Sequence, residues 1–259
     1  MKQIFFIFSV TLLLTSCLTN KPSSTLHLDT KTYDFRLDSL EMFDNSRNRK
    51  IPVAFFQPKP DKRIKNQQVV IFSHGYGQNK GGDNLCYSYL TENLASKGYY
   101  VVSIQHELPT DELLPMDGNL QITRRSNWER GAENILFVLK KMKEIKPDLD
   151  YQRLTLIGHS NGADMTVLFA HKHPELAYKI ISMDNRRMPL PRISKPKVYT
   201  LRSNDFPADE QVLPTIDEQI KYGIVIQQTQ INHSSMDDDA TTTERKIMND
   251  FIEKYLNEK

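Results

Sequence analysis

Short runs of apolar residues alternate along this chain with segments of helical spacing, and this alternation constrains the fold most. The run 68–73 (QVVIFS) is continuous and apolar, which is typical of a strand buried on both faces of a parallel sheet. Further strands are expected at residues 33–40, 51–57, 99–104, 153–157, 179–183, 197–201 and 223–228. Helices are expected at residues 85–97, 125–145, 163–170, 209–222 and 242–256. The pattern predicts an α/β fold with a mainly parallel sheet.

The sequence GHSNG at residues 158–162 matches the pattern G-x-S-x-G and lies between an expected strand and an expected helix. A sharp, strained turn from strand to helix needs glycine or another small residue at its flanks. The turn presents Ser160 at the amino end of the helix, where the helix dipole favours developing negative charge. We therefore predict that Ser160 is a nucleophile.

The loop SHGYG at residues 73–77 follows the buried strand 68–73. Acyl transfer turns a carbonyl oxygen into an anion, which needs preorganised N–H donors. We expect one donor to be the backbone N–H of Asn161, beside the nucleophile, and the second to be that of Tyr76. The glycines of this loop would let its backbone approach a substrate closely.

These segments carry a family resemblance. The stretches VVIFSHGYG, LASKGYYVVSIQHE, LIGHSNG and NHSSMDD resemble the α/β-hydrolase superfamily, and within it the branches that contain platelet-activating-factor acetylhydrolases and dienelactone hydrolases. The resemblance runs from about Val69 to Tyr255. It implies an eight-stranded, mostly parallel sheet flanked by helices, and hydrolysis of carboxylic esters without a metal or another cofactor.

The family order of catalytic residues is serine, acid, histidine. Among the seven histidines only His233 comes late enough in the chain, after the last expected strand. As the general base, His233 would take the proton of Ser160 and pass it to the leaving alkoxide. His74 and His159 are expected to stabilise the two loops that contain them.

Two carboxylates compete for the third position. Asp205 follows the strand 197–201, at the position usual for the acid in the superfamily, and Asp184 follows the preceding strand, as in the acetylhydrolase branch. We favour Asp205, because Arg186 and Arg187 could hold Asp184 in a structural ion pair. Asp184 remains the alternative acid, and Asp209 is a weaker third candidate.

The first residues look like a processing signal. Lys2 precedes an apolar stretch that is too short to span a bilayer and that ends in LTSC at residues 14–17, which resembles a bacterial lipobox. The resemblance implies a signal peptide at residues 1–16, lipidation of Cys17, and attachment to a membrane of the bacterial cell envelope. Residues 17–27 would form a tether and residues 28–259 a single hydrolase domain. An ordinary secretory signal with a chance cysteine is the alternative.

Charge excludes one class of partner. The chain has 34 basic and 32 acidic residues, and no Lys/Arg-rich run, so nucleic acid is not expected to bind. The expected function is hydrolysis of a small-molecule or lipid ester through an acyl-enzyme on Ser160. The alternatives are a serine peptidase of similar fold and a catalytically inactive, lipid-anchored binding protein.

The long connection after the strand 99–104 is expected to shape the substrate pocket or to form a surface loop without contact to it. Three arginines lie in this region or just after it, at positions 124, 125 and 130. They could pair with anionic groups of a substrate, or equally with Glu129 and Glu133.

Overall fold

The apolar runs form the strands of one sheet in the computed structural model, which describes Met1 and residues 32–60 and 63–258. The eight strands are β1 (Phe35–Asp44), β2 (Arg49–Pro58), β3 (Gln68–Ser73), β4 (Tyr100–Ile104), β5 (Asp150–His159), β6 (Lys179–Met183), β7 (Lys197–Arg202) and β8 (Val225–Gln228). All five residues of β4 and of β6 are buried, as expected for strands covered on both faces.

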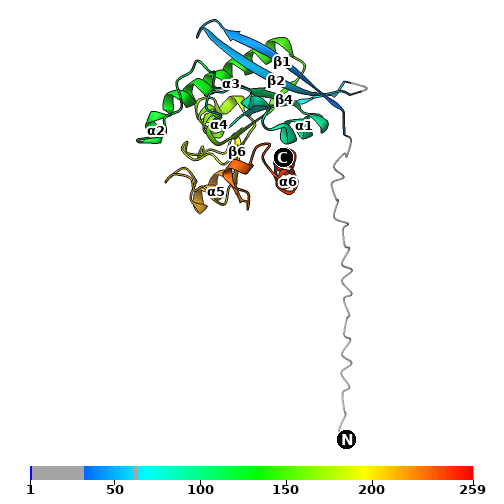
Figure 1. Cartoon of the computed structure of the whole chain (residues 1–259). Helices are drawn as coiled ribbons and strands as arrows, with labels where there is room; N and C mark the ends of the chain where they lie inside the picture. Colours follow the sequence, from blue (N-terminus) through cyan, green and yellow to red (C-terminus); the bar gives the residue numbers. More distant parts are fainter. Residues whose placement is uncertain (2–31, 61–62, 259) are drawn as a thin grey trace. The chain divides into compact units, whose positions relative to one another are not determined.

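The strand order is β1-β2-β4-β3-β5-β6-β7-β8. β1 and β2 form an antiparallel hairpin, β2 pairs antiparallel with β4, and every later pair is parallel. The mostly parallel, eight-stranded sheet expected from the resemblance is therefore confirmed (Figure 1).

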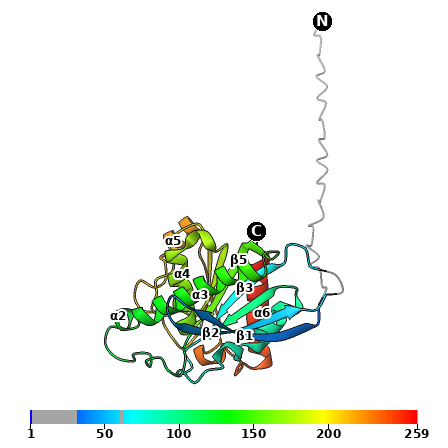
Figure 2. The same ribbon diagram turned by 90° about the horizontal axis from the view of Figure 1, so that it is seen from above.

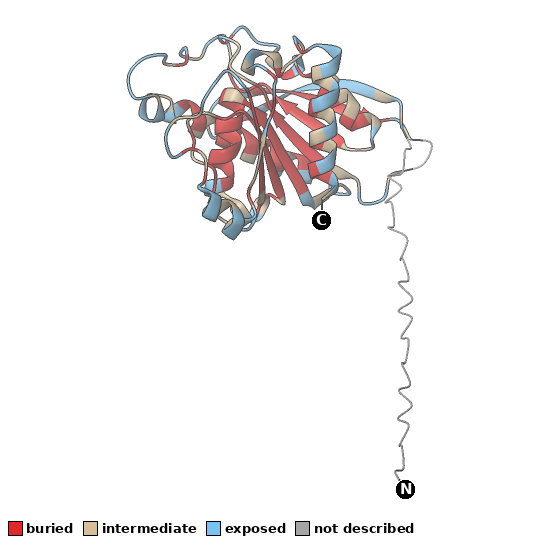
Figure 3. Ribbon diagram, turned by 90° about the horizontal axis from the view of Figure 1, so that it is seen from below, coloured by how far each residue is buried: buried red, intermediate tan, exposed pale blue. Residues whose placement is uncertain are grey.

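Helices cover both faces of this sheet (Figure 2). Val69 and Ile71 of β3 belong to a core with α3 (Arg125–Ile145) and α4 (Ser160–Lys172). The alternate residues Val70 and Phe72 belong to a second core with α1 (Ser88–Ser96) and α6 (Thr242–Asn257). Successive side chains of a strand point to opposite faces, so one continuous apolar run supplies both cores. Figure 3 shows the resulting buried centre.

The helix boundaries follow local capping chemistry. At the start of α6 the Thr241 hydroxyl accepts the Glu244 N–H, and the Glu244 carboxylate accepts the Thr241 N–H. The same arrangement of Thr215 and Glu218 begins α5 at Ile216. The helix expected at residues 209–222 is therefore shorter than predicted, Ile216–Tyr222, because Thr215 fixes its start directly after Pro214. The structure also contains a short helix, α2 (Leu120–Thr123), and three 3-10 helices: η1 (Asp83–Leu85), η2 (Pro174–Leu176) and η3 (His233–Ser235).

The carboxyl ends of the parallel strands place the chemistry-bearing loops at one edge of the sheet. Residues 74–77 follow β3, Ser160 follows β5, Asp184 follows β6, and His233 comes after β8. Open α/β sheets bind ligands at this edge.

Several predictions concern residues outside the described part of the chain. These are the signal peptide 1–16, the lipidation site Cys17 and the tether 17–27. Within the described residues, no helix is both long and apolar enough to span a bilayer.

Candidate active site

Ser160 lies at the junction where β5 passes directly into α4. Its φ is 52°, in the left-handed region that a residue with a side chain adopts only at a cost. A Cβ atom on Gly162 would lie 2.2 Å from the carbonyl oxygen of His74, and one on Gly158 would lie 2.5 Å from the carbonyl oxygen of Gly162. Both glycines are therefore required by close backbone approach, as the G-x-S-x-G pattern predicts.

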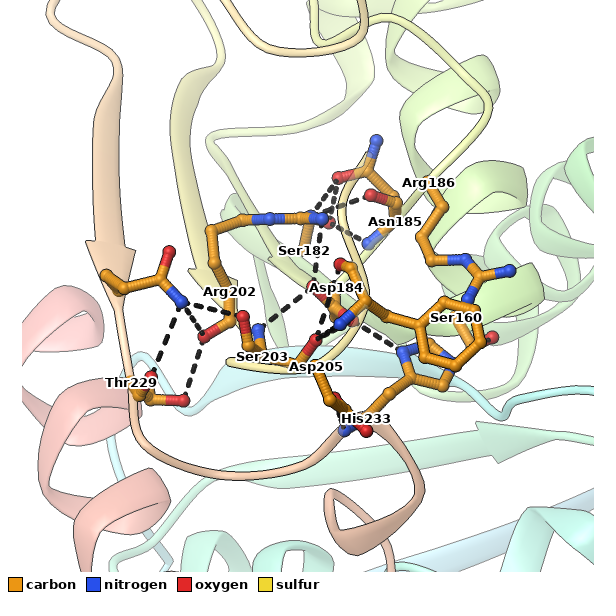
Figure 4. A network of polar contacts seen from close by, with 12 residues as sticks. Ser160, Ser182, Asp184, Asn185, Arg186, Arg202, Ser203, Asp205, Thr229 and His233 are labelled. Carbon is orange, nitrogen blue, oxygen red and sulfur yellow. Dashed lines mark hydrogen bonds and ion pairs between the residues drawn. The ribbon is translucent and has the colours of Figure 1, made fainter. Parts of the chain in front are cut away.

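His233 connects this serine to a carboxylate. Its Nε2 lies 2.9 Å from the Ser160 Oγ, and its Nδ1 lies 2.5 Å from an oxygen of Asp184. The three side chains come from the ends of β5 and β6 and from η3, so the fold assembles them from distant parts of the sequence (Figure 4). This geometry permits proton transfer from the serine to the imidazole.

Asp184 is held by more than the histidine. It is completely buried, its Oδ1 accepts the backbone N–H of Ser203 at 3.0 Å, and its Oδ2 accepts the Ser203 hydroxyl at 2.7 Å. The Arg202 guanidinium lies 2.9 Å from Oδ1. Burial opposes ionisation, but the hydrogen bonds from His233 and Ser203 and the charge of Arg202 outweigh it, so the pKa of Asp184 lies below its ordinary value.

The geometry shows that our preference for Asp205 as the acid that orients His233 is wrong. Asp205 is exposed, and its carboxylate accepts the backbone N–H of His233 at 2.7 Å instead of meeting the imidazole (Figure 4). The ion pair expected between Asp184 and Arg186 or Arg187 does not form among the described residues. Arg202 pairs with Asp184 instead, and Arg187 pairs with Asp209 at 2.6 Å. Asp209 is thereby removed as the third candidate.

A cavity of about 310 Å³ opens beside Ser160 and His233. The loop of residues 75–77 lines this cavity, so Tyr76 borders the same space as Ser160. Asn161 is the second residue of α4, so its backbone N–H has no acceptor within the helix. Tyr76 thus lines the cavity, and Asn161 directly follows Ser160 in the chain.

The loop of residues 75–77 is fixed by a side chain that the sequence analysis missed. The hydroxyl of Tyr87 accepts the N–H of Gly75 at 2.9 Å and lies 2.7 Å from His159 Nδ1. Burial, followed by the nearby His233, lowers the pKa of His159 to about 3, so this imidazole is neutral and can accept the Tyr87 proton. His74 also holds its loop, through a 2.6 Å contact with the carbonyl of Gly75 and by accepting the N–H of His106.

The side chain of Asn161 turns away from the cavity into a buried polar network. Its amide donates to Glu107 at 2.8 Å and to Asn127 at 2.9 Å, and its oxygen accepts the Trp128 indole N–H at 2.8 Å. Glu107 is 1% exposed, and burial raises the pKa of its carboxyl group. No local pattern marks these residues, because the network joins β4, α3 and α4 only in the folded chain.

The lining of the cavity is acidic. Asp83, Asp237 and Asp239 line it, and neither lysine nor arginine does. Burial and the neighbouring carboxylates raise the pKa of Asp237. In the described part of the chain, His, Cys, Asp and Glu side chains form no group of three or more that could hold a metal ion.

The fold and the strained serine between β5 and α4 define an α/β-hydrolase. The family model for Chlorophyllase matches residues 28–213, so the chain belongs to that family. A search of curated proteins gave no match. The resemblance to the α/β-hydrolase superfamily is confirmed.

Solved structures share the fold at low identity. Carboxyl esterase 2 from Tuber melanosporum has 12% identity and a TM-score of 0.63, with 86% of each chain covered. A serine hydrolase without a lid from Xanthomonas campestris has 14% identity and a TM-score of 0.59, with 86% of this chain and 97% of that chain covered. A putative dipeptidyl aminopeptidase IV from Bacteroides ovatus has 16% identity and a TM-score of 0.59, with 88% of this chain but 36% of that chain covered.

Proposed function

We propose that this protein is a serine hydrolase that cleaves carboxylic esters through an acyl-enzyme on Ser160. The observation that carries the proposal is the continuous contact from the Ser160 hydroxyl through His233 to the buried Asp184, at the wall of a cavity. Nucleophile, base and orienting acid in hydrogen-bond reach are the arrangement that activates a serine.

In the proposed mechanism, the Ser160 Oγ attacks the ester carbonyl carbon while His233 Nε2 takes its proton. The carbonyl oxygen becomes an anion, and the backbone N–H groups of Asn161 and Tyr76 stabilise it. The bond to the alcohol then breaks, and the imidazolium returns the proton to the leaving alkoxide. A water molecule, deprotonated by His233, hydrolyses the acyl-enzyme and restores Ser160. Asp184 holds the imidazole in the required tautomer and stabilises its positive charge.

The names of similar structures support an ester as the substrate, because the Tuber melanosporum protein is a carboxyl esterase. A serine peptidase is the second candidate, since a putative dipeptidyl aminopeptidase shares the fold. The match covers 36% of that peptidase, so the likeness concerns the common hydrolase fold. An inactive binding protein is disfavoured by the intact Ser160–His233–Asp184 contacts.

A panel of 4-nitrophenyl esters of graded acyl length tests the proposal. We expect turnover of at least the acetyl ester, loss of turnover by several orders of magnitude in Ser160→Ala, and a preferred acyl length that reports the pocket. Turnover of dipeptide 4-nitroanilides but of no ester would favour the peptidase. A protein that turns over neither would favour the binding protein.

We also propose, from the sequence, that Cys17 is lipidated and anchors the protein in the bacterial cell envelope. Lipid anchoring by two or more acyl chains is lasting, since each buried CH₂ contributes about 0.8 kcal/mol. Cells fed a radioactive fatty acid should label the wild-type protein, and Cys17→Ala should remove the label. Equal labelling of the mutant would refute the anchor, and the exposed Cys86 supplies a matched control as Cys86→Ala.

A further inference from the structure

A guanidinium group stands beside the proposed triad without an anionic partner. Arg186 follows Asp184 by two residues and is half-buried. Its guanidinium lies 3.7 Å from the centre of the Phe206 ring, and that ring lies 5.4 Å from the imidazole ring of His233. Figure 4 shows Arg186 in the same group of side chains as Ser160 and His233. Among the described residues, no carboxylate forms an ion pair with Arg186.

Arg124 carries the second guanidinium group without an anionic partner. It lies between α2 and α3, where its Nε donates to the carbonyl of Pro115 at 2.8 Å and its Nη2 contacts the sulfur of Met116 at 3.2 Å. Neither acceptor carries a charge. Four other arginines near the site do have carboxylate partners: Arg125 with Glu129, Arg130 with Asp111, Arg187 with Asp209, and Arg202 with Asp184.

Arg124 acts electrostatically on Arg186, and the loop that Arg124 holds is tied to the cavity wall, because the N–H of Leu114 donates to the Tyr76 hydroxyl at 3.0 Å. Burial lowers the pKa of Arg124, and the neighbouring charge of Arg187 lowers it further. Burial lowers the pKa of Arg186 as well, and with the charges of Arg187 and Arg124 it brings this pKa to about 10. The nearby acids are Asp164, Asp184 and Asp209, and Asp184 is engaged by Arg202 and His233. Asp209 is engaged by Arg187, and Asp164 accepts the backbone N–H groups of Arg187 and Met188. Positive charge is therefore in excess on this side of the site.

The cavity beside Ser160 has the reverse polarity, because Asp83, Asp237 and Asp239 line it. A substrate that reaches Ser160 thus meets acidic groups in the cavity, while the two arginines lie outside the residues that line it. An anionic substituent would be repelled by the first and held by the second.

We propose that Arg124 and Arg186 form a binding site for an anionic oxygen group, a carboxylate or phosphate, on the ester that Ser160 cleaves. The planar guanidinium fork suits both groups, and Phe206 and Met116 supply apolar surface for the carbon chain that carries them. The inference rests on the proposed ester hydrolysis and specifies its substrate class, anionic esters.

The test compares esters that differ only in charge. Mono-4-nitrophenyl adipate and its uncharged monoamide place the charge on the acyl side. The esters 4-acetoxybenzoate and 4-acetoxyphenyl phosphate, against 4-acetoxybenzamide, place it on the alcohol side. We expect wild-type protein to favour the anionic member by about 10- to 100-fold in kcat/KM in one of these sets, the range for a hydrogen bond to a charged group.

The variants Arg124→Gln and Arg186→Gln keep N–H donors but remove the charge. Each should bring this preference close to one while leaving turnover of the uncharged esters within a few fold. Arg125→Gln is the matched control, since Arg125 is exposed and paired with Glu129, and it should keep the preference. An absent preference in the wild type, or a preference unchanged in both arginine variants, would overturn the inference. Turnover of the uncharged esters tests the proposed function separately.

Discussion

Asp184 and Asp205 both contact His233, but they contact different atoms of it. Asp184 meets the imidazole Nδ1, where a negative charge can stabilise the imidazolium, and Asp205 meets the backbone N–H, where it can only fix the loop. The two roles predict different losses when each carboxylate is converted to an amide.

We predict that Asp184→Asn lowers kcat by about 10⁴-fold, because the amide neither favours the correct tautomer nor stabilises the imidazolium. Asp205→Asn keeps an oxygen that can accept the His233 N–H, so we expect kcat within about tenfold of wild type. Steady-state hydrolysis of 4-nitrophenyl acetate measures both, with thermal unfolding as a check on folding. A larger loss in Asp205→Asn would reverse the assignment.

The sequence was sufficient to propose Ser160 and His233, which the structure brings into contact, but not to choose between these acids. Ser160 is marked by a local motif, and His233 by its place after the last strand. Asp184 and Asp205 both follow parallel strands that end at the same edge of the sheet. Asp184 adopts a φ of 59° and is held by Arg202, the last residue of β7, and by Ser203, which follows it. Contacts of that kind are created by the fold and leave no local pattern.

At the scale of elements, β4, α3 and α4 meet in the network around the Asn161 side chain. Glu107 follows β4, Asn127 and Trp128 belong to α3, and Asn161 belongs to α4. These bonds fix the first turn of α4, and with it the backbone N–H that we propose for the oxyanion. A defect in this network should therefore reach the chemical step without any contact to substrate.

We predict that Glu107→Ala lowers kcat by about tenfold or more with little change in KM. Removal of an oxyanion donor itself would lower kcat by more than this. Glu107→Gln should restore most of kcat, because its amide oxygen can still accept from Asn161. Steady-state kinetics at matched folded fractions measure both variants. Equal kcat values for the alanine and glutamine variants would argue against a positioning role.

The contact between α4 and the loop after β6 predicts a pH-dependent stability. Asp164 of α4 is 2% exposed and accepts the backbone N–H groups of Arg187 and Met188. Burial raises the pKa of its carboxyl from 3.8 to about 6 in the folded protein. Between these values the folded state binds more protons than the unfolded state, so the free energy of unfolding falls as pH rises from about 4 to 6.

The free energy of unfolding of the wild type should fall by up to about 3 kcal/mol across this pH range. We therefore expect Asp164→Asn to remove this decrease. The asparagine oxygen can still accept both N–H groups. Urea unfolding from pH 4 to pH 8 measures the difference between the two proteins. A parallel pH dependence in both would show that Asp164 is already ionised at low pH when folded.

The elements themselves were largely predictable, because apolar runs and capping residues are local signals. The strand at Gln68–Ser73 and the helix at Arg125–Ile145 lie where the pattern placed them. The start of α5 was misplaced because Thr215 and Glu218 were not recognised as a capping box. The spatial order of the strands, with β4 between β2 and β3, depends on pairing between distant residues and came only from the structure.

At the scale of the whole molecule, the sheet and the loops at its edge contribute different properties. The sheet is shared with hydrolases of 12% and 14% identity, so it specifies the fold and the positions of Ser160, Asp184 and His233. The loops at its edge carry the acidic lining of the cavity and the two unpaired arginines. We therefore propose that the fold positions the nucleophile and that the charge around it selects the substrate.

The most direct test of the central claim, that Ser160 is an activated nucleophile, is covalent labelling with a fluorophosphonate followed by peptide mass spectrometry. We expect a single adduct on Ser160, absent in Ser160→Ala and strongly slowed in His233→Ala, since the base is needed to activate the hydroxyl. An unlabelled wild-type protein, or an adduct that persists in Ser160→Ala, would contradict the claim.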